Sequence, residues 1–305
     1  MRAVICTQYG GPEVLKLQEV SKPIPKDSQI LVRIVATAVN SADVRVRSLD
    51  VNGVMKVIMR LVLGISKPRK PILGTVFSGV VETVGHKVTK FKAGDNVFGM
   101  TGFNFGTYAE YIAINQNSNV LEMPNNATYE EAASIIFGGQ TAIYFLEKSK
   151  IATVPNKKIL IIGATGSVGT AAIQLAKHHK ADITAVCSSE GQNLVLGLGV
   201  KNIILYDKED YTQHTDKFDI IFDAIGKSNR KKCKKLLNNN GIYKSVSSIN
   251  ASETIQQLEL LKNLFENGEL KAVIDKTFPM ENIVEAHRYV DTGRKKGNVI
   301  LRINE

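Results

Sequence analysis

Tryptophan is absent from this chain of 305 residues, and proline and cysteine are scarce, with eight and three copies. The three cysteines, Cys6, Cys187 and Cys233, stand far apart in the sequence, and no C-x-x-C pair occurs. That spacing excludes a local zinc cluster held by neighbouring cysteines. An odd number of widely spaced thiols fits a reducing compartment, so we expect all three to be buried as small apolar side chains.

A long apolar run is also lacking. The N-terminal stretch "MRAVICTQYGG" has no apolar region followed by a cleavage site, so it does not resemble a secretory signal. The longest apolar-looking stretch, Gly53–Ile65, contains Lys56 and Arg60 and is too short to span a bilayer. We therefore expect a cytoplasmic protein with no membrane partner. Two interpretations of Gly53–Ile65 stay open, a helix packed on its own domain and a lid that closes an apolar pocket.

Acidic residues are the minority: 29 Asp and Glu stand against 39 Lys and Arg, for a formal net charge of +10. A basic chain can bind nucleic acid, an anionic membrane or an anionic cofactor. The densest basic run, Lys227–Leu237, is predicted to be a helix with its lysines in water and Cys233, Leu236 and Leu237 facing inward. No aromatic residue interrupts that run, so it offers no platform for stacking bases, and we expect no nucleic-acid partner.

Two rhythms of apolar residues divide the chain. The first third has the short alternating runs and Gly-rich turns of a β-rich domain, with strands expected at Arg2–Tyr9, Val14–Val20, Ser28–Val39, Thr75–Gly85, Asp95–Met100 and Gly106–Ile114. Two helices are expected next, on either side of Gly138-Gly139-Gln140, the first with a capping box from Thr128 to Glu131.

Short apolar strands and helices then alternate. This pattern predicts a parallel sheet with helices on both faces, which we expect to hold six strands. The closing segments are a helix, a strand, a second helix carrying His287 toward the surface, and a last strand. Because the parallel sheet is already complete, we expect these closing strands to return to the first domain.

A glycine-rich turn links the predicted strand Lys158–Ile162 to a helix that begins near Ser167. Gly166 and Gly169 hold the second and third glycine places of the dinucleotide-binding fingerprint, and Ala164 stands at the first. Gly166 lets the backbone approach a pyrophosphate, Gly169 lets the helix pack closely on the strand, and the first-turn N–H groups face the phosphates. The predicted pyrophosphate-binding residues are Ala164, Thr165, Gly166, Ser167, Val168 and Gly169.

The end of the next strand bears on the choice between NAD and NADP. Ser188 and Ser189 stand where NAD-binding chains usually place an acidic residue, and small hydroxyls leave room for a 2′-phosphate and can donate to it. Tyr206 and Lys208, at the end of the next strand, can supply an aromatic ring and a positive charge to the cofactor. Ser247 and Ser248 follow the last strand at the sheet edge where the nicotinamide is expected. We predict NADP(H), although Glu190 rather than a lysine or arginine follows the two serines.

Several stretches, in this order and over nearly the whole chain, resemble the medium-chain dehydrogenase/reductase superfamily in its zinc-free quinone oxidoreductase-like branch. They are "VNSADVRVRS", "LGTVFSGVVETVGHKVTKFKAGDNVFG", "GTYAEY", "EAASIIFGGQTAIYFL", "IIGATGSVGTAAIQLAK", "FDIIFDAIG" and "VIDKTFPMENIVEAHRYVDTGRKKGNVIL". The resemblance implies an α/β protein with a GroES-like catalytic domain (residues 1–120, with 271–305 returning to it) and a Rossmann domain with a doubly wound parallel sheet (121–270). It also implies NADPH between the domains, a quinone or enone substrate, and a homodimer.

The departures from the zinc-dependent relatives concern the metal. Those relatives place a cysteine where this chain has Asn40, and His-Glu where it has Thr75-Val76. Threonine and valine supply no zinc ligand, so we expect no metal and no Lewis acid. Val76 also differs from the aspartate that many zinc-free relatives have at that place.

Reduction of an enone without metal places hydride on the β-carbon and negative charge on the oxygen, which needs hydrogen-bond donors. Asn40, in the turn after the strand Ser28–Val39, resembles the family's motif asparagine and is the candidate donor; its alternative role is to satisfy its own turn. Asp43 either positions Asn40 or caps the helix that begins there. We name no general acid, because water can supply the final proton, and we give every histidine a structural role.

Three functions follow, in order of preference. The first is an NADPH-dependent, zinc-independent reductase of quinones or α,β-unsaturated carbonyls. The second is a zinc-free alcohol or aldehyde reductase, and the third is a nucleotide-sensing binding protein that keeps the fold without catalysis.

Overall fold

The computed structural model describes residues 1–49, 53–153, 156–247 and 251–304. The chain divides into two compact units, Met1–Ile136 with Ile274–Glu305, and Phe137–Val273. The boundary between them falls within one helix, α3 (Tyr129–Lys148).

The N-terminal unit is built on a seven-stranded sheet in which β3 (Gln29–Val39) is central. Nearly every β3 residue is buried, because β4, β6 and β14 all pair with this strand, in antiparallel fashion. The order is β13-β14-β3-β4-β5-β7, and β6 pairs with β3. The other strands of this sheet are β4 (Val76–Val84), β5 (Asn96–Met100), β6 (Tyr111–Asn115), β7 (Val120–Glu122), β13 (Ile274–Pro279) and β14 (Asn298–Arg302). A hairpin of β1 (Arg2–Cys6) and β2 (Leu15–Glu19) forms a separate sheet.

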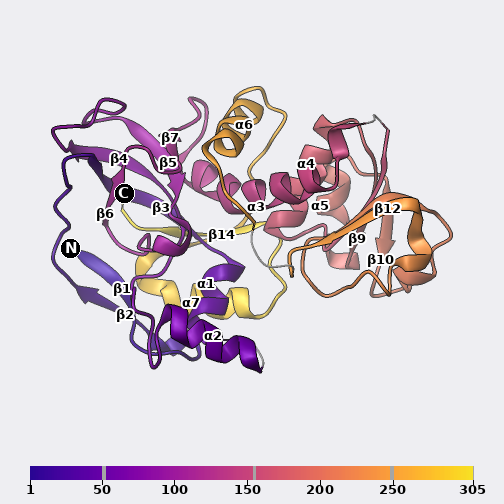
Figure 1. Cartoon of the computed structure of the whole chain (residues 1–305), viewed down its shortest axis with the longest axis horizontal. Coiled ribbons are helices and arrows are strands. Elements are labelled where there is room, and N and C mark those ends of the chain that lie inside the picture. The colour runs from indigo at the N-terminus through magenta and orange to yellow at the C-terminus, as the bar shows by residue number, and fades with distance from the viewer. Residues whose placement is uncertain (50–52, 154–155, 248–250, 305) are drawn as a thin grey trace. The chain divides into compact units, whose positions relative to one another are not determined.

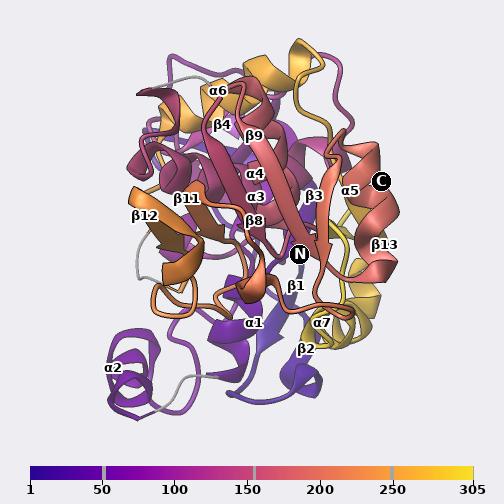
Figure 2. The ribbon, with the colours of Figure 1, turned by 90° about the vertical axis from the view of Figure 1, so that its right-hand side faces the viewer.

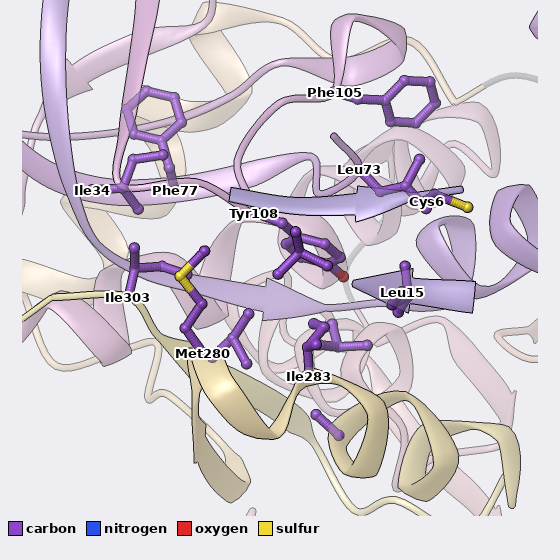
Figure 3. Packing of buried hydrophobic residues seen from close by; sticks show 14 of the residues in the cluster. Cys6, Leu15, Ile34, Leu73, Phe77, Phe105, Tyr108, Met280, Ile283 and Ile303 are labelled. Atoms are coloured by element: carbon purple, nitrogen blue, oxygen red, sulfur yellow. The ribbon is translucent and has the colours of Figure 1, made fainter. Parts of the chain in front are cut away.

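Within the described residues, the helices of this unit are α1 (Ser41–Ser48), α2 (Val54–Leu63), α7 (Ile283–Asp291) and the first part of α3. The core lies between the strands and α7. Figure 3 shows Tyr108 in its middle, with Ile283 of α7 on one side and Leu73 on the other, and all three side chains are buried. Burial of these large apolar groups is the main source of stability of the unit.

The C-terminal unit contains a five-stranded, wholly parallel sheet in the order β10-β9-β8-β11-β12. Figure 2 shows its strands side by side. They are β8 (Lys158–Ile162), β9 (Asp182–Cys187), β10 (Asn202–Leu205), β11 (Phe218–Asp223) and β12 (Leu237–Ser245). The helices are the later part of α3, α4 (Ser167–His178), α5 (Gln192–Gly197) and α6 (Ile255–Glu266). Strand order reverses between β8 and β11, the place where doubly wound sheets bind ligands.

The predicted α/β fold, with a parallel sheet and a β-rich domain, is confirmed. The predicted six strands are wrong, because the parallel sheet has five strands within the described residues. The prediction that Cys6, Cys187 and Cys233 are buried is confirmed, and all three are free thiols.

The two predicted helices around Gly138-Gly139 are in fact one helix, α3. A Cβ on Gly138 would lie 2.3 Å from the Ser167 carbonyl oxygen, and one on Gly139 would lie 2.5 Å from a methyl group of Leu261. These glycines therefore allow close packing and do not end the helix. The predicted capping box is present, since Glu131 N–H donates to Thr128 Oγ1 and Thr128 N–H donates to Glu131 Oε2.

The predicted helix over Lys227–Leu237 is wrong. The segment forms turns and one short 3₁₀ helix, Lys234–Leu236, before β12 begins. Two causes act against an α-helix: the Asp223 carboxylate holds the backbone N–H of Ser228, and basic residues repeat at spacings of four, which destabilises a helix by repulsion. Cys233 and Leu236 are buried as predicted, and Leu237 is half-buried.

Candidate functional site

The glycine turn joins β8 to α4 by a very close approach of two backbones. A Cβ on Gly169 would lie 2.2 Å from the Gly163 carbonyl oxygen and 2.8 Å from the Ala164 carbonyl carbon. Only glycine fits there without moving backbone. The helix therefore begins directly over the end of the strand, and Ser167 and Val168 form its buried first turn.

At Gly166, the N-cap residue of α4, the space that a side chain would occupy is empty of protein atoms. Gly166 has ordinary extended backbone angles, offers no side chain to cap the helix, and its Cβ would meet nothing nearer than the Gly163 oxygen at 3.8 Å. The N-terminus of α4 carries the positive end of the helix dipole. Open space at such an end suits a phosphate, so these residues fit the pyrophosphate of a dinucleotide.

Strands β9 and β10 place the predicted cofactor-binding residues Ser188 and Tyr206 at the carboxyl ends of neighbouring strands. Cys187 pairs with Leu205, and the Tyr206 N–H donates to the Cys187 carbonyl at 3.0 Å. Ser188 and Tyr206 are therefore neighbours just beyond the strand ends, and the Tyr206 side chain is exposed. Thr165 packs against this region, since a Cβ on Gly191 would lie 2.5 Å from its methyl group.

Sequence reasoning missed Asp207, which is hydrogen-bonded to Ser189 at the carboxyl ends of these strands. The Ser189 N–H donates to Asp207 Oδ1 at 2.9 Å, and the pKa of Asp207 is lowered first by the Ser189 hydroxyl and then by this N–H. The Ser189 hydroxyl is buried near this carboxylate without reaching hydrogen-bond geometry. The Asp207 carboxylate thus lies beside the expected position of the 2′-phosphate. In the sequence, only its place directly after Tyr206 could have indicated this.

A second missed residue, Asp223, ends β11 on the other side of β8. Its buried carboxylate accepts hydrogen bonds from the N–H groups of Ile225, Gly226 and Ser228 and from the hydroxyls of Tyr243 and Ser245. One side chain therefore orders the loops after both β11 and β12. The exposed Ser247 lies in the second loop, with its hydroxyl 2.9 Å from that of Ser245. The predicted Ser248 lies outside the described residues.

Asn40 is the N-cap of α1 and is almost completely buried. Its Oδ1 accepts from the N–H groups of Ala42 and Asp43, and its Nδ2 donates to Thr75 Oγ1 at 2.8 Å. Asp43 Oδ2 in turn accepts from the Asn40 N–H at 3.1 Å, which completes a capping box. Asn40 thus satisfies its own turn and also has its amide fixed by a side chain from a distant part of the sequence.

A buried polar cluster lies behind Asp43, on α1 and α7 of the same unit. Arg47 is 2% exposed and makes two hydrogen bonds with Asp291, at 3.0 and 2.8 Å, and its Nη1 lies 3.5 Å from His287 Nδ1. The Tyr108 ring meets His287 edge to face, and its hydroxyl interacts with the Asp43 carboxyl without reaching hydrogen-bond geometry. The predicted surface position of His287 is wrong, because this side of α7 packs into the core.

Burial moves the pKa values of two groups in this cluster in opposite directions. It raises the pKa of Asp43 to about 7 and, together with the charge of Arg47, lowers the pKa of His287 to about 3. Folded Asp43 holds its proton more tightly than unfolded Asp43, so its contribution to stability is lost as the pH rises from about 4 to 7. Folded His287 resists protonation, so its contribution is lost as the pH falls below about 6.5. Between pH 4 and 6.5 the two effects oppose each other.

The Asp43→Asn variant is expected to expose the His287 contribution. Its stability should rise from pH 4 to 6.5 more steeply than that of the wild type, by at most about 1.4 kcal/mol per pH unit. Urea unfolding of the N-terminal unit, followed at several pH values, measures the slope. Asp27→Asn, at an exposed carboxylate, is the matched control. If Asp43→Asn and the wild type have the same slope, Asp43 and His287 do not oppose each other in this pH range.

Two further findings concern metal binding and membrane crossing. Within the described residues, no group of three or more His, Cys, Asp or Glu side chains is arranged to hold a metal ion. In the same part of the chain, no helix has the length and apolar character needed to cross a membrane.

Three family models match successive parts of the chain. Residues 26–125 match the alcohol dehydrogenase GroES-like domain, residues 158–255 the NAD binding domain of semialdehyde dehydrogenase, and residues 244–301 the zinc-binding dehydrogenase family. The first covers most of the β-rich unit, and the second covers the parallel sheet.

Similar proteins extend over the whole chain. It is 34% identical to a 2-methylene-furan-3-one reductase of Solanum lycopersicum, over 99% of this chain and 79% of the relative. It is 30% identical to the chloroplastic NADPH-dependent alkenal/one oxidoreductase of Arabidopsis thaliana, with the same coverage, and 30% identical to the quinone oxidoreductase of Homo sapiens, over 99% and 97%. Among solved structures, the quinone oxidoreductase from Coxiella burnetii superposes with a TM-score of 0.89 at 24% identity, covering 100% of this chain and 99% of that one.

Proposed function

The chain belongs to the medium-chain dehydrogenase/reductase superfamily, in its quinone oxidoreductase-like branch, and from this premise we propose that it is a zinc-independent, NADPH-dependent reductase of quinones or α,β-unsaturated carbonyls. The observation that carries the proposal is the open space at Gly166, at the N-terminus of α4 and the carboxyl end of a parallel strand. The names of the similar proteins, a furanone reductase, an alkenal/one oxidoreductase and a quinone oxidoreductase, support the substrate class.

Each group of residues has a proposed task. The bound nicotinamide supplies the hydride. The backbone from Ala164 to Gly169 holds the pyrophosphate at the start of α4, and Asp223 keeps the loop of Ser247 in place at the sheet edge. An Asn amide has two N–H donors, and Thr75 accepts from Asn40, so we assign the remaining donor to the substrate oxygen that gains negative charge.

Zinc independence rests on the chemistry of the side chains present. At the places where zinc-dependent relatives carry their ligands, this chain has Asn40 and Thr75, and these two are hydrogen-bonded to each other at 2.8 Å. Neither an amide nor a threonine hydroxyl is among the usual protein ligands of zinc. Turnover is therefore expected to be unchanged by a chelator, and its loss on chelation with recovery on adding zinc would overturn this part of the proposal.

The preference for NADPH rests on Ser188, since its small side chain leaves room for a 2′-phosphate at the end of β9. Ser188→Asp is expected to reverse the preference, because a carboxylate repels a 2′-phosphate and accepts from a ribose 2′-OH. The ratio of kcat/KM for NADPH and NADH measures the change, with an expected shift of about tenfold or more. Asn239→Asp adds the same charge on β12, the edge strand on the far side of the sheet from β9, and should leave the ratio unchanged. An unchanged ratio in Ser188→Asp would count against NADPH.

NADPH oxidation against a panel of quinones and enones, with NADH in parallel, tests the reaction itself. An enone reductase turns over an enone faster than the corresponding saturated ketone, whereas an alcohol or aldehyde reductase shows the reverse. A purified protein that binds NADPH and oxidises it with no member of the panel would favour the nucleotide-sensing alternative.

A homodimer in the cytoplasm completes the proposal. It is supported by the family relationship and by β12, which is an edge strand of the parallel sheet within the described residues. Light scattering after size-exclusion chromatography gives the mass that decides the oligomeric state.

A further inference from the structure

The outer side of α2 is apolar and exposed, which is unusual for a surface helix. Figures 1 and 2 both show α2 at the outer margin of the N-terminal unit. Between 45% and 69% of the surface of each of five apolar side chains is in solvent: Val57, Ile58, Leu61, Val62 and Ile65. An exposed apolar patch of this kind usually marks an interaction site.

The helical spacing separates this patch from the core. Val57, Ile58, Leu61 and Val62 follow the i, i+1, i+4, i+5 pattern that places residues on one side of a helix. Leu63 lies on the other side, packs against the core of the unit, and holds α2 to it. The outward side therefore has a role other than folding.

Positive charge accompanies the patch on the Leu63 side of α2 and in the segment that follows the helix, and no acidic residue occurs between Gly53 and Val81. Five exposed basic residues lie in this stretch: Lys56, Arg60, Lys67, Arg69 and Lys70. Three of them follow α2, and two of these three are held by hydrogen bonds: Arg69 donates to the Leu61 carbonyl at 3.0 Å, and Lys70 donates to Asn104 Oδ1 at 2.7 Å. Phe103, which is 75% exposed, stands next to Asn104 and adds an apolar side chain beside the cations.

We propose that α2, with the basic segment Lys67–Lys70, is a docking surface for an anionic lipid membrane, on which the helix lies in the plane of the headgroups. A protruding apolar helix with flanking lysine and arginine side chains is the usual form of an interfacial anchor. Since no helix of the described residues can cross a membrane, the contact is peripheral. The proposal revises the expectation of no membrane partner and does not rest on the proposed function.

Charge and shape favour lipid over two other occupants. A second copy docked through the same surface would bring the basic segments Lys67–Lys70 of both copies together, which is repulsive. An acidic amphipathic peptide would need a groove, and a single projecting helix offers a ridge. An anionic bilayer accepts both features, because acyl chains surround the ridge and headgroups pair with the cations.

The absence of tryptophan allows a direct test with single-tryptophan variants. Leu61→Trp in the full chain is mixed with vesicles of phosphatidylcholine containing 30% phosphatidylglycerol, and its emission should shift to shorter wavelength. Each basic residue at an anionic surface strengthens binding about fivefold, so the shift should weaken strongly in pure phosphatidylcholine and at high salt. Ile24→Trp, at an exposed position outside α2, is the control and should show no shift.

A loss-of-binding variant gives the complementary result. Leu61→Asp with Val62→Asp should reduce co-sedimentation with the anionic vesicles about tenfold or more, and the matched Ile24→Asp should not. Absence of vesicle binding by the wild type, or equal binding by the double variant, overturns the proposal. Two further outcomes overturn it. If the wild type is a dimer that the double variant dissociates, the occupant is a second copy. If the double variant binds vesicles normally but loses turnover, α2 is a lid.

Discussion

In the Gly166→Ala variant, NADPH affinity is expected to fall about tenfold or more while the fold stays intact. A Cβ at this position meets no protein atom within 3.4 Å, and the backbone angles of Gly166 suit alanine. The new methyl group would occupy the space assigned to the pyrophosphate. Calorimetric titration with NADPH measures the affinity, and thermal unfolding measures the stability.

Gly169→Ala is the counterpart of that variant. Its methyl group would collide with the backbone of Gly163 and Ala164, so the C-terminal unit should lose stability whether or not NADPH is present. If Gly166→Ala binds NADPH as tightly as the wild type, the cofactor does not approach this turn, and the assignment of the site fails.

Arg47→Ala is expected to cost the N-terminal unit about 2–3 kcal/mol, less than the loss of one partner of a fully buried ion pair, because the Asp291 side chain is 30% exposed. Arg47 links α1, which begins with the capping box of Asn40, to Asp291 at the end of α7. The midpoint of urea unfolding of this unit, followed by circular dichroism, gives the change in stability.

Arg288→Ala provides the matched control. Arg288 pairs with Glu13 at 2.8 Å, the same distance as the Arg47–Asp291 pair, but both side chains are more than half exposed. Water screens such a pair, so its loss should change the stability far less than the loss of Arg47. Equal stability of the two variants would show that burial of Arg47 adds nothing.

Local patterns in the sequence predicted the elements that local physics determines. Strand β8, the glycine turn and α4 were predictable because an apolar run, two glycines at fixed spacing and a helical period all lie within twenty residues. The capping box of Thr128 was predictable for the same reason. Asn40 could be placed in a turn, and the family resemblance selected it as a candidate.

Contacts between distant segments were not predictable in this way. Gly138 and Gly139 read as a helix break, yet tertiary packing makes them part of one helix. Asp207 and Asp223 act across the ends of neighbouring strands, and no spacing in the sequence shows that Ser189 or Ser245 lies opposite them. The burial of His287 depends in the same way on Tyr108 and Arg47, which are far away in sequence.

The three buried cysteines have a consequence for the proposed reduction of electrophiles. Enones and quinones undergo conjugate addition by thiolates, and a solvent-accessible thiol of ordinary pKa would be alkylated during turnover. Burial raises the pKa of Cys6 and of Cys187 to about 11 and also raises that of Cys233, so all three stay protonated at neutral pH. The fold thus keeps its own nucleophiles out of reach of the compounds it is proposed to reduce.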